Sequence, residues 1–199
     1  MLEIIQSGGW MIWPILLSSV IAMGIIFERF WSLRQDRIMP PELLQKISVL
    51  KQHLATVDSE IASIDDDSAF AAMINVAIQQ RTASKAIARE RLEEVGRQIV
   101  HQLQFFLTTL GTIAVITPLL GLLGTVLGMI DVFMAMSAMT VSEPEALAGG
   151  IAKALITTAA GISVAIPSLI FVRYFRRKVI GLVLQMETQA ILLIDRIAP

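Results

Sequence analysis

Residues 105–133 read FFLTTLGTIAVITPLLGLLGTVLGMIDVF, and residues 149–172 read GGIAKALITTAAGISVAIPSLIFV. Both stretches are apolar enough to cross a bilayer, yet both carry threonines, spaced glycines and a proline where a simple anchor would carry leucine. Small residues let helix backbones approach closely, and buried hydroxyls form hydrogen bonds across such contacts. The two stretches therefore predict membrane helices that pack tightly around a polar path.

Three segments of the chain are long enough to span a membrane. Residues 4–27 and 154–172 hold no charged side chain, and neither do residues 98–130 if His101 is neutral. A helix needs about 20 largely apolar residues to cross roughly 30 Å of hydrocarbon. Overall composition agrees, because 55% of the residues are hydrophobic. We expect an all-α membrane protein with an uncleaved first span, its three spans lying at about 8–30, 105–135 and 149–173.

The basic residues predict the orientation of these spans. Ten of the 16 Lys and Arg residues lie between the first two spans and five follow the third, whereas Lys153 lies near the outer end of the third. Cytoplasmic segments are enriched in Lys and Arg. We therefore expect an external N-terminus, a cytoplasmic helical loop at about 34–104, a short external turn and a cytoplasmic tail at 174–199.

Apolar residues also recur at helical spacing outside the spans. After Pro40 and Pro41 the first such face comprises Leu43, Ile47, Leu50, Leu54, Val57 and Ile61. A short helix capped near Asp65–Ser68 carries Phe70, Met73, Ile74 and Ala77, and the tail carries Val179, Val183, Met186, Ala190, Leu193 and Ile197. We expect these faces to pack on one another within the chain, with packing between subunits as the alternative.

Two further signals concern the helix boundaries around the spans. Nothing breaks the pattern from Ser84 into the second span, which predicts one helix over about 84–138. The stretch Ser142-Glu143-Pro144-Glu145 has the form of a capping box with proline in the first turn. The third spanning helix is therefore expected to begin near residue 143.

Several classes of function have little support in the composition. The chain has no cysteine, and its two histidines, His53 and His101, do not have the spacing of metal ligands. A net charge of −1 gives no reason to expect a nucleic-acid partner. We expect no enzyme activity, no cofactor and no metal.

Small and hydroxyl residues form a stripe on each of the last two spans. The second span aligns Thr117, Gly121, Thr125 and either Gly128 or Met129, and Gly124 and Gly128 make a GxxxG pattern. The third aligns Ala154, Thr157 or Thr158, Gly161 and Ala165, with Pro167 beyond them. Ordinary helix packing explains any one of these residues alone. Two such stripes, together with Pro118 and Pro167, favour a lined cavity or pore.

Charged groups near the spans give two further expectations. Lys153 costs a few kcal/mol within a span unless it pairs, snorkels or reaches water, and Asp131 is its candidate counter-ion, within or between subunits. No carboxylate lies near the middle of any span. If the protein handles protons, the titrating residue is therefore expected on a partner.

At these residues the chain resembles the MotA/TolQ/ExbB proton-channel family, and in particular its ExbB-type members. The matches are PLLGLLGTVLGMI at residues 118–130, GIAKALITTAAGISVAIPS at residues 150–168, and Phe27-Glu28-Arg29 after the first span. The resemblance extends over nearly the whole chain. At Lys153 many relatives carry glutamate or glutamine, so this chain departs from them there.

The resemblance implies a function and an assembly. It implies a homo-oligomeric ring, with five subunits, in the bacterial inner membrane, around two single-span ExbD-type helices. Proton flow on the partner's transmembrane aspartate would drive TonB-type transport at the outer membrane. It also implies that Thr125 and Thr158 line the proton path, and that Pro118 and Gly121 belong to the packing motif.

Other functions remain open at this stage. A TolQ-like stator for envelope maintenance would use the same architecture. A non-conducting membrane scaffold would need the small residues but not the hydroxyls. A secondary transporter is poorly supported, because three spans show no inverted repeat.

Overall fold

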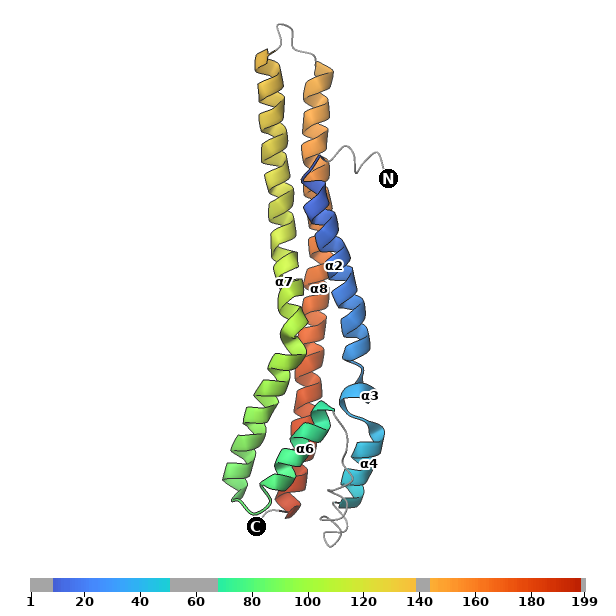
Figure 1. Ribbon diagram of the computed structural model, residues 1–199, viewed down its shortest axis with the longest axis vertical. Helices are drawn as coiled ribbons and strands as arrows, with labels where there is room; N and C mark the ends of the chain where they lie inside the picture. Colours follow the sequence, from blue (N-terminus) through green and yellow to red (C-terminus); the bar gives the residue numbers. More distant parts are fainter. Residues whose placement is uncertain (1–8, 51–67, 139–143, 198–199) are drawn as a thin grey trace. The chain divides into compact units, whose positions relative to one another are not determined.

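The computed structural model describes residues 9–50, 68–138 and 144–197, and all regular secondary structure within these ranges is helical (Figure 1). The helices are α2 (Ile12–Ser32), α3 (Gln35–Ile38), α4 (Pro41–Leu50), α6 (Ala69–Gln79), α7 (Lys85–Ala138) and α8 (Pro144–Ile197). Helices α2, α7 and α8 are long and apolar enough to cross a membrane. The described residues are thus all-helical or irregular, and their three long apolar helices are consistent with a multi-pass membrane protein.

The chain divides into two compact units. The membrane unit comprises Met1–Glu28 and Phe106–Tyr174, and the loop–tail unit comprises Arg29–Phe105 and Phe175–Pro199. Helices α2, α7 and α8 each contribute residues to both units.

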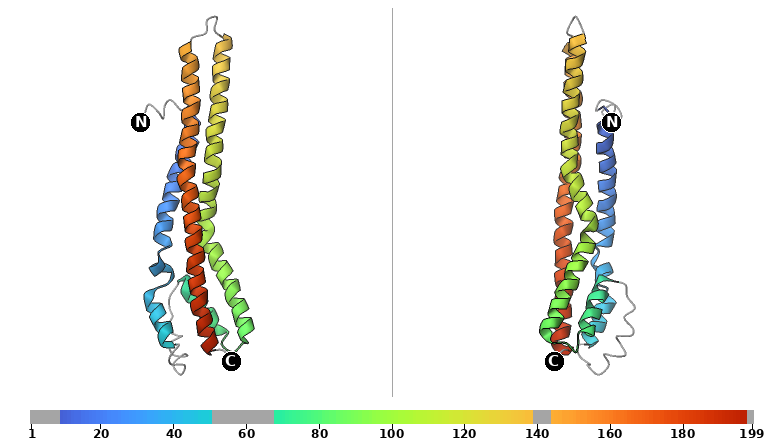
Figure 2. Two further views of the ribbon diagram at one scale, coloured as in Figure 1. Left: turned by 180° about the vertical axis from the view of Figure 1, so that it is seen from behind. Right: turned by 60° about the vertical axis from the view of Figure 1, so that its left-hand side comes forward.

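Within the membrane unit, α7 and α8 run alongside each other (Figure 1 and Figure 2), and their glycines are in contact. Large apolar side chains on α2 remain well exposed, among them Trp13, Leu17 and Val20 at 67%, 63% and 71%. Such a surface is unfavourable in water and suits contact with lipid or with other membrane helices. The buried residues of this unit lie between its helices and include Ile15, Leu110 and Ala154.

In the loop–tail unit, α6 begins where the sequence predicts. The side chain of Ser68 accepts a 3.2 Å hydrogen bond from the backbone N–H of Ala71, which caps the helix. The predicted apolar face of this helix is fully buried: Phe70, Met73, Ile74 and Ala77 are all 0% exposed. This confirms the short capped helix.

The apolar face of the tail is buried as well. Val179, Met186 and Ala190 are 0% exposed, and Val183 and Leu193 are nearly so. This confirms the expectation that the tail packs within the chain. The single long helix is also confirmed, because α7 runs from Lys85 to Ala138 past Pro118 without a break.

Two contacts fix the start of the loop–tail unit. The Arg29 guanidinium is 5% exposed and donates a 2.9 Å hydrogen bond to the carbonyl oxygen of Leu103 on α7. The rings of Phe30 and Phe175 meet edge to face, with centroids 5.0 Å apart. A charge-assisted bond and an aromatic pair thus tie the end of α2 to α7 and α8.

Some expectations concern residues that the structure does not describe. The first loop helix is seen as α4, with Leu43 and Ile47 buried, but Leu54, Val57 and Ile61 lie outside the described residues. Ser142 and Glu143 of the predicted capping box also lie outside them. Helix α8 begins at Pro144, next to the expected boundary.

Candidate functional site between the two long helices

The membrane parts of α7 and α8 come into backbone contact at two glycines. A β-carbon placed on Gly161 would lie 2.5 Å from the carbonyl oxygen of Thr117, and one placed on Gly121 would lie 3.0 Å from the Cα of Thr158. No larger residue fits at either position without moving a helix. The glycines therefore permit direct backbone contact between the two helices, as small residues do in membrane proteins.

This contact continues along both helices toward the ends of the spans. A β-carbon on Gly124 would meet the methyl group of Thr157, and one on Gly128 would lie 3.4 Å from the β-carbon of Ala154. The structure thus brings the four glycines expected at helix contacts, Gly121, Gly124, Gly128 and Gly161, to one α7–α8 seam. Pro118 is half-buried, and Pro167 is exposed.

The side chain of Thr158 makes a hydrogen bond across the seam. The hydroxyl of Thr158 donates to the carbonyl oxygen of Gly121, with an oxygen–oxygen distance of 3.1 Å. The hydroxyl of Thr125 instead donates to the carbonyl oxygen of Leu122 on its own helix, at 2.6 Å. Both threonines are half-buried in the chain. Each hydroxyl proton is therefore already used in a hydrogen bond to a backbone carbonyl. Each hydroxyl oxygen still has lone pairs that can accept a hydrogen bond.

Helices α7 and α8 carry buried hydroxyl residues beyond the two predicted ones. Thr117 is 0% exposed, Thr157 1% and Ser168 1%, and each hydroxyl donates to a carbonyl four residues earlier on its own helix. The stripe pattern contains Thr117 and leaves Thr157 and Thr158 as alternatives. The structure separates that pair: Thr157 is buried against Gly124, and Thr158 bonds across the seam.

Asp131 and Lys153 line one hollow of about 110 Å³ in the membrane unit, together with Gly9, Trp10, Met11, Gly124, Leu127 and Gly128. Asp131 is exposed and Lys153 half-buried. Both residues are described, and no ion pair within 4.0 Å joins them. The structure therefore brings the two charges to one site, and their direct pairing stays a prediction.

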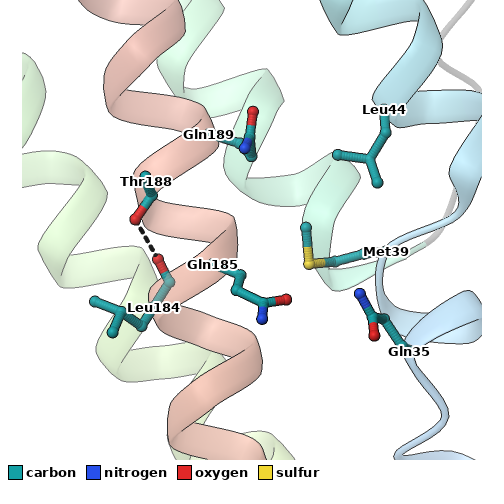
Figure 3. A pocket seen from close by; sticks show the side chains of 7 residues that line it. All are labelled: Gln35, Met39, Leu44, Leu184, Gln185, Thr188 and Gln189. Atoms are coloured by element: carbon teal, nitrogen blue, oxygen red, sulfur yellow. Dashed lines mark hydrogen bonds between the residues drawn. The ribbon is translucent and has the colours of Figure 1, made fainter.

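A larger hollow of about 380 Å³ lies in the loop–tail unit between the α3–α4 region and α8 (Figure 3). The amide groups of Gln35 and Gln185 and the thioether of Met39 point into it. None of the described residues that line this hollow is charged. Sequence patterns gave no sign of it, because its wall combines residues from distant parts of the chain.

Comparison with known proteins finds relatives that share most of this chain. A model of the "MotA/TolQ/ExbB proton channel family" matches residues 60–188, which include both stripes and the seam. The chain belongs to the MotA/TolQ/ExbB proton channel family. The resemblance seen in its sequence motifs is thereby confirmed.

Relatives within this family carry both ExbB and TolQ names. The chain is 34% identical over 180 residues to the putative biopolymer transport protein ExbB-like 3 of Synechocystis sp., covering 86% of this chain and 82% of that protein. It is 31% identical over 179 residues to biopolymer transport protein exbB1 of Vibrio cholerae, covering 82% and 74%. The Tol-Pal system protein TolQ of Haemophilus influenzae is 45% identical over 60 residues, covering 30% of this chain and 26% of that protein.

Proposed function

We propose that this MotA/TolQ/ExbB-family chain is an ExbB-type subunit of a proton-driven complex in the bacterial inner membrane. Five copies form a ring around two single-span ExbD-type helices, with the N-terminus outside and the C-terminus in the cytoplasm. Proton flow through this complex energises TonB-dependent transport at the outer membrane. The chain itself performs no enzymatic reaction and needs no cofactor.

The observation that carries this proposal is the state of the two half-buried hydroxyls. Thr158 donates its proton to Gly121 across the seam, and Thr125 donates its own to Leu122. Neither hydroxyl needs a further acceptor, so each presents its oxygen as an acceptor. A protonated carboxyl group or a relay water is the donor that such an oxygen suits.

This geometry lets Thr158 and Thr125 distinguish the protonated form of the partner's carboxyl group from the ionised form. The neutral acid donates to the oxygen of Thr158 or Thr125, whereas the carboxylate finds no free hydroxyl proton there. An ionised carboxylate is also costly against an apolar wall. Protonation therefore both neutralises the partner's aspartate and gives it a bond with the wall, which favours its movement along the ring.

The test compares three substitutions by uptake through a TonB-dependent receptor and by proton flux into liposomes. Thr158→Val should abolish both without changing assembly, because valine keeps the shape and removes the oxygen. Thr158→Ser should retain both. Thr112→Val is the matched control, since Thr112 is exposed on α7 and its hydroxyl bonds its own helix at Thr108. Unchanged uptake and flux in Thr158→Val would exclude the relay role.

A TolQ-like role in envelope maintenance is the second candidate, favoured by the 45% identity over 60 residues to TolQ of Haemophilus influenzae. Co-expression with an ExbD-type or a TolR-type partner, followed by native mass spectrometry of the intact complex, separates the two roles. Retention of two copies of the ExbD-type partner supports the TonB-linked function. Selective retention of the TolR-type partner would assign the chain to envelope maintenance.

A non-conducting scaffold makes a different prediction for the threonines. A scaffold needs the glycine seam but no acceptor oxygen in it. Thr158→Val would then leave uptake intact, while a bulky substitution at Gly121 would still remove it. Proton flux that stops in Thr158→Val while the ring persists would contradict the scaffold.

A further inference from the structure

The hollow around Asp131 and Lys153 lies at the end of a predicted membrane span. Its residues Gly9, Trp10 and Met11 directly precede α2, the first of the candidate membrane spans, which begins at Ile12. Trp10 and Trp13 are 68% and 67% exposed there. Tryptophan concentrates at the border between hydrocarbon and headgroups. The hollow therefore opens at the level where phospholipid headgroups lie.

The backbone is shaped to hold the lysine in this hollow. Gly9 has a φ of +68°, and a β-carbon on it would lie 2.5 Å from Cε and 3.0 Å from Nζ of Lys153. Glycine at this position thus allows both the left-handed backbone and the passage of the lysine side chain. The ammonium is directed to the hollow rather than free to extend in any direction.

Neither charge in the hollow is paired with a residue that the structure describes. The ammonium of Lys153 and the carboxylate of Asp131 make no hydrogen bond or ion pair with any residue that the structure describes. A half-buried ammonium beside apolar side chains is unfavourable unless water or a ligand compensates it. The volume of about 110 Å³ is several times what one water needs, about 10–15 Å³, so a larger polar group fits.

We propose that this hollow binds the headgroup of a zwitterionic phospholipid, with the lipid phosphate on Lys153 and the lipid ammonium on Asp131. One cation and one anion in the same cavity match a ligand that itself carries both charges. A headgroup with only a phosphate would satisfy Lys153 but meet repulsion from Asp131. A primary ammonium, which donates hydrogen bonds, suits a carboxylate better than a quaternary one. Phosphatidylethanolamine is therefore the preferred ligand.

The proposal is tested by native mass spectrometry of the full chain released from mixed micelles. The probes are phosphatidylethanolamine, phosphatidylcholine and phosphatidylglycerol with identical acyl chains. Wild-type protein should retain phosphatidylethanolamine most strongly. Lys153→Gln should weaken that retention about tenfold or more, the size expected for loss of a hydrogen bond from a charged group. Lys178→Gln removes the same charge far from the hollow in sequence and should leave retention unchanged.

Two further variants keep the result interpretable. Asp131→Asn should lower retention of phosphatidylethanolamine and raise that of phosphatidylglycerol, because it removes the repulsion. Gly9→Ala keeps both charges but places a methyl group where the lysine passes, so it should also lower retention. Melting temperatures in detergent then show whether a variant has lost lipid or lost its fold.

Two results would overturn the proposal. One is a wild-type protein that retains the three lipids equally. The other is a retention of phosphatidylethanolamine that Lys153→Gln and Asp131→Asn leave unchanged, while each of these variants and the double variant lower the melting temperature equally. That second pattern would mean that the two charges pair with each other, within or between copies.

Discussion

Gly161 on α8 faces the backbone of Thr117 on α7 so closely that a β-carbon on the glycine would lie 2.5 Å from the threonine carbonyl oxygen. That oxygen belongs to the helix backbone and cannot turn aside. The contact therefore limits how closely the two helices can pack. It also explains why a glycine in an otherwise apolar span contributes to the fold.

Gly161→Ala should destabilise the protein by about 1–3 kcal/mol, because the added methyl group must push the helices apart. The measurement is thermal unfolding in detergent. Gly149→Ala is the control on the same helix, since nothing lies within 4 Å of its β-carbon position. That variant should be neutral or gain up to about 1 kcal/mol from helix propensity. Equal melting temperatures for the two variants would contradict the close contact.

Thr158→Val should lower stability only slightly, by about 0.5–1.5 kcal/mol, since it removes one neutral hydrogen bond to Gly121. The backbone oxygen of Gly121 is not left bare, because it also lies within the helical hydrogen-bond ladder. Detergent unfolding and oligomer mass measure this. A collapse of the fold would show that the hydroxyl is structural, and uptake data from this variant would then say nothing of a relay.

Arg29→Met should destabilise the loop–tail unit by about 1.5–3 kcal/mol, the range for a hydrogen bond from a charged group. The guanidinium is almost fully buried and donates to Leu103 at 2.9 Å. Arg29→Lys keeps the charge but loses the planar fork, so its loss should be smaller but measurable. Arg97→Met, at an exposed site on α7, should change stability by less than about 0.5 kcal/mol. Limited proteolysis at increasing urea reports on this unit.

Glu187→Gln should stabilise the protein at neutral pH and not at acid pH. Burial and then the nearby carboxylate of Glu93 raise the pKa of Glu187, which lies against Gly96 in the loop–tail unit. A raised folded-state pKa gives stability that is full below the unfolded value and is lost as pH rises through the folded value. Glutamine does not ionise, so Glu187→Gln does not lose stability as the pH rises.

The measurement for Glu187 is the difference in melting temperature between Glu187→Gln and wild type. It should be positive near about pH 7.5 and vanish near about pH 4, close to the ordinary glutamate value. Glu90→Gln, at an exposed site on α7, should differ little from wild type at both pH values. A difference for Glu187→Gln that does not vary with pH would point to packing rather than charge.

Much of this protein could be predicted from residue patterns alone. Uncharged runs indicate the three spans, the stretch around Ser68 indicates the start of α6, and the unbroken pattern after Ser84 indicates α7. These features are local: each depends on residues within a few turns of one helix. The motifs at residues 118–130 and 150–168 likewise indicate the family, because they are contiguous.

Contacts between helices required the tertiary structure. Adjacent residues on a helix differ by about 100° in direction, so a stripe identifies a face but not which neighbour meets it. Periodicity leaves Thr157 and Thr158 as alternatives, whereas the position of α7 buries one and bonds the other. The same holds for Arg29 with Leu103, and for Lys153 over Gly9. Sequence determined which helices form, and the packing of those helices decided which side chains meet.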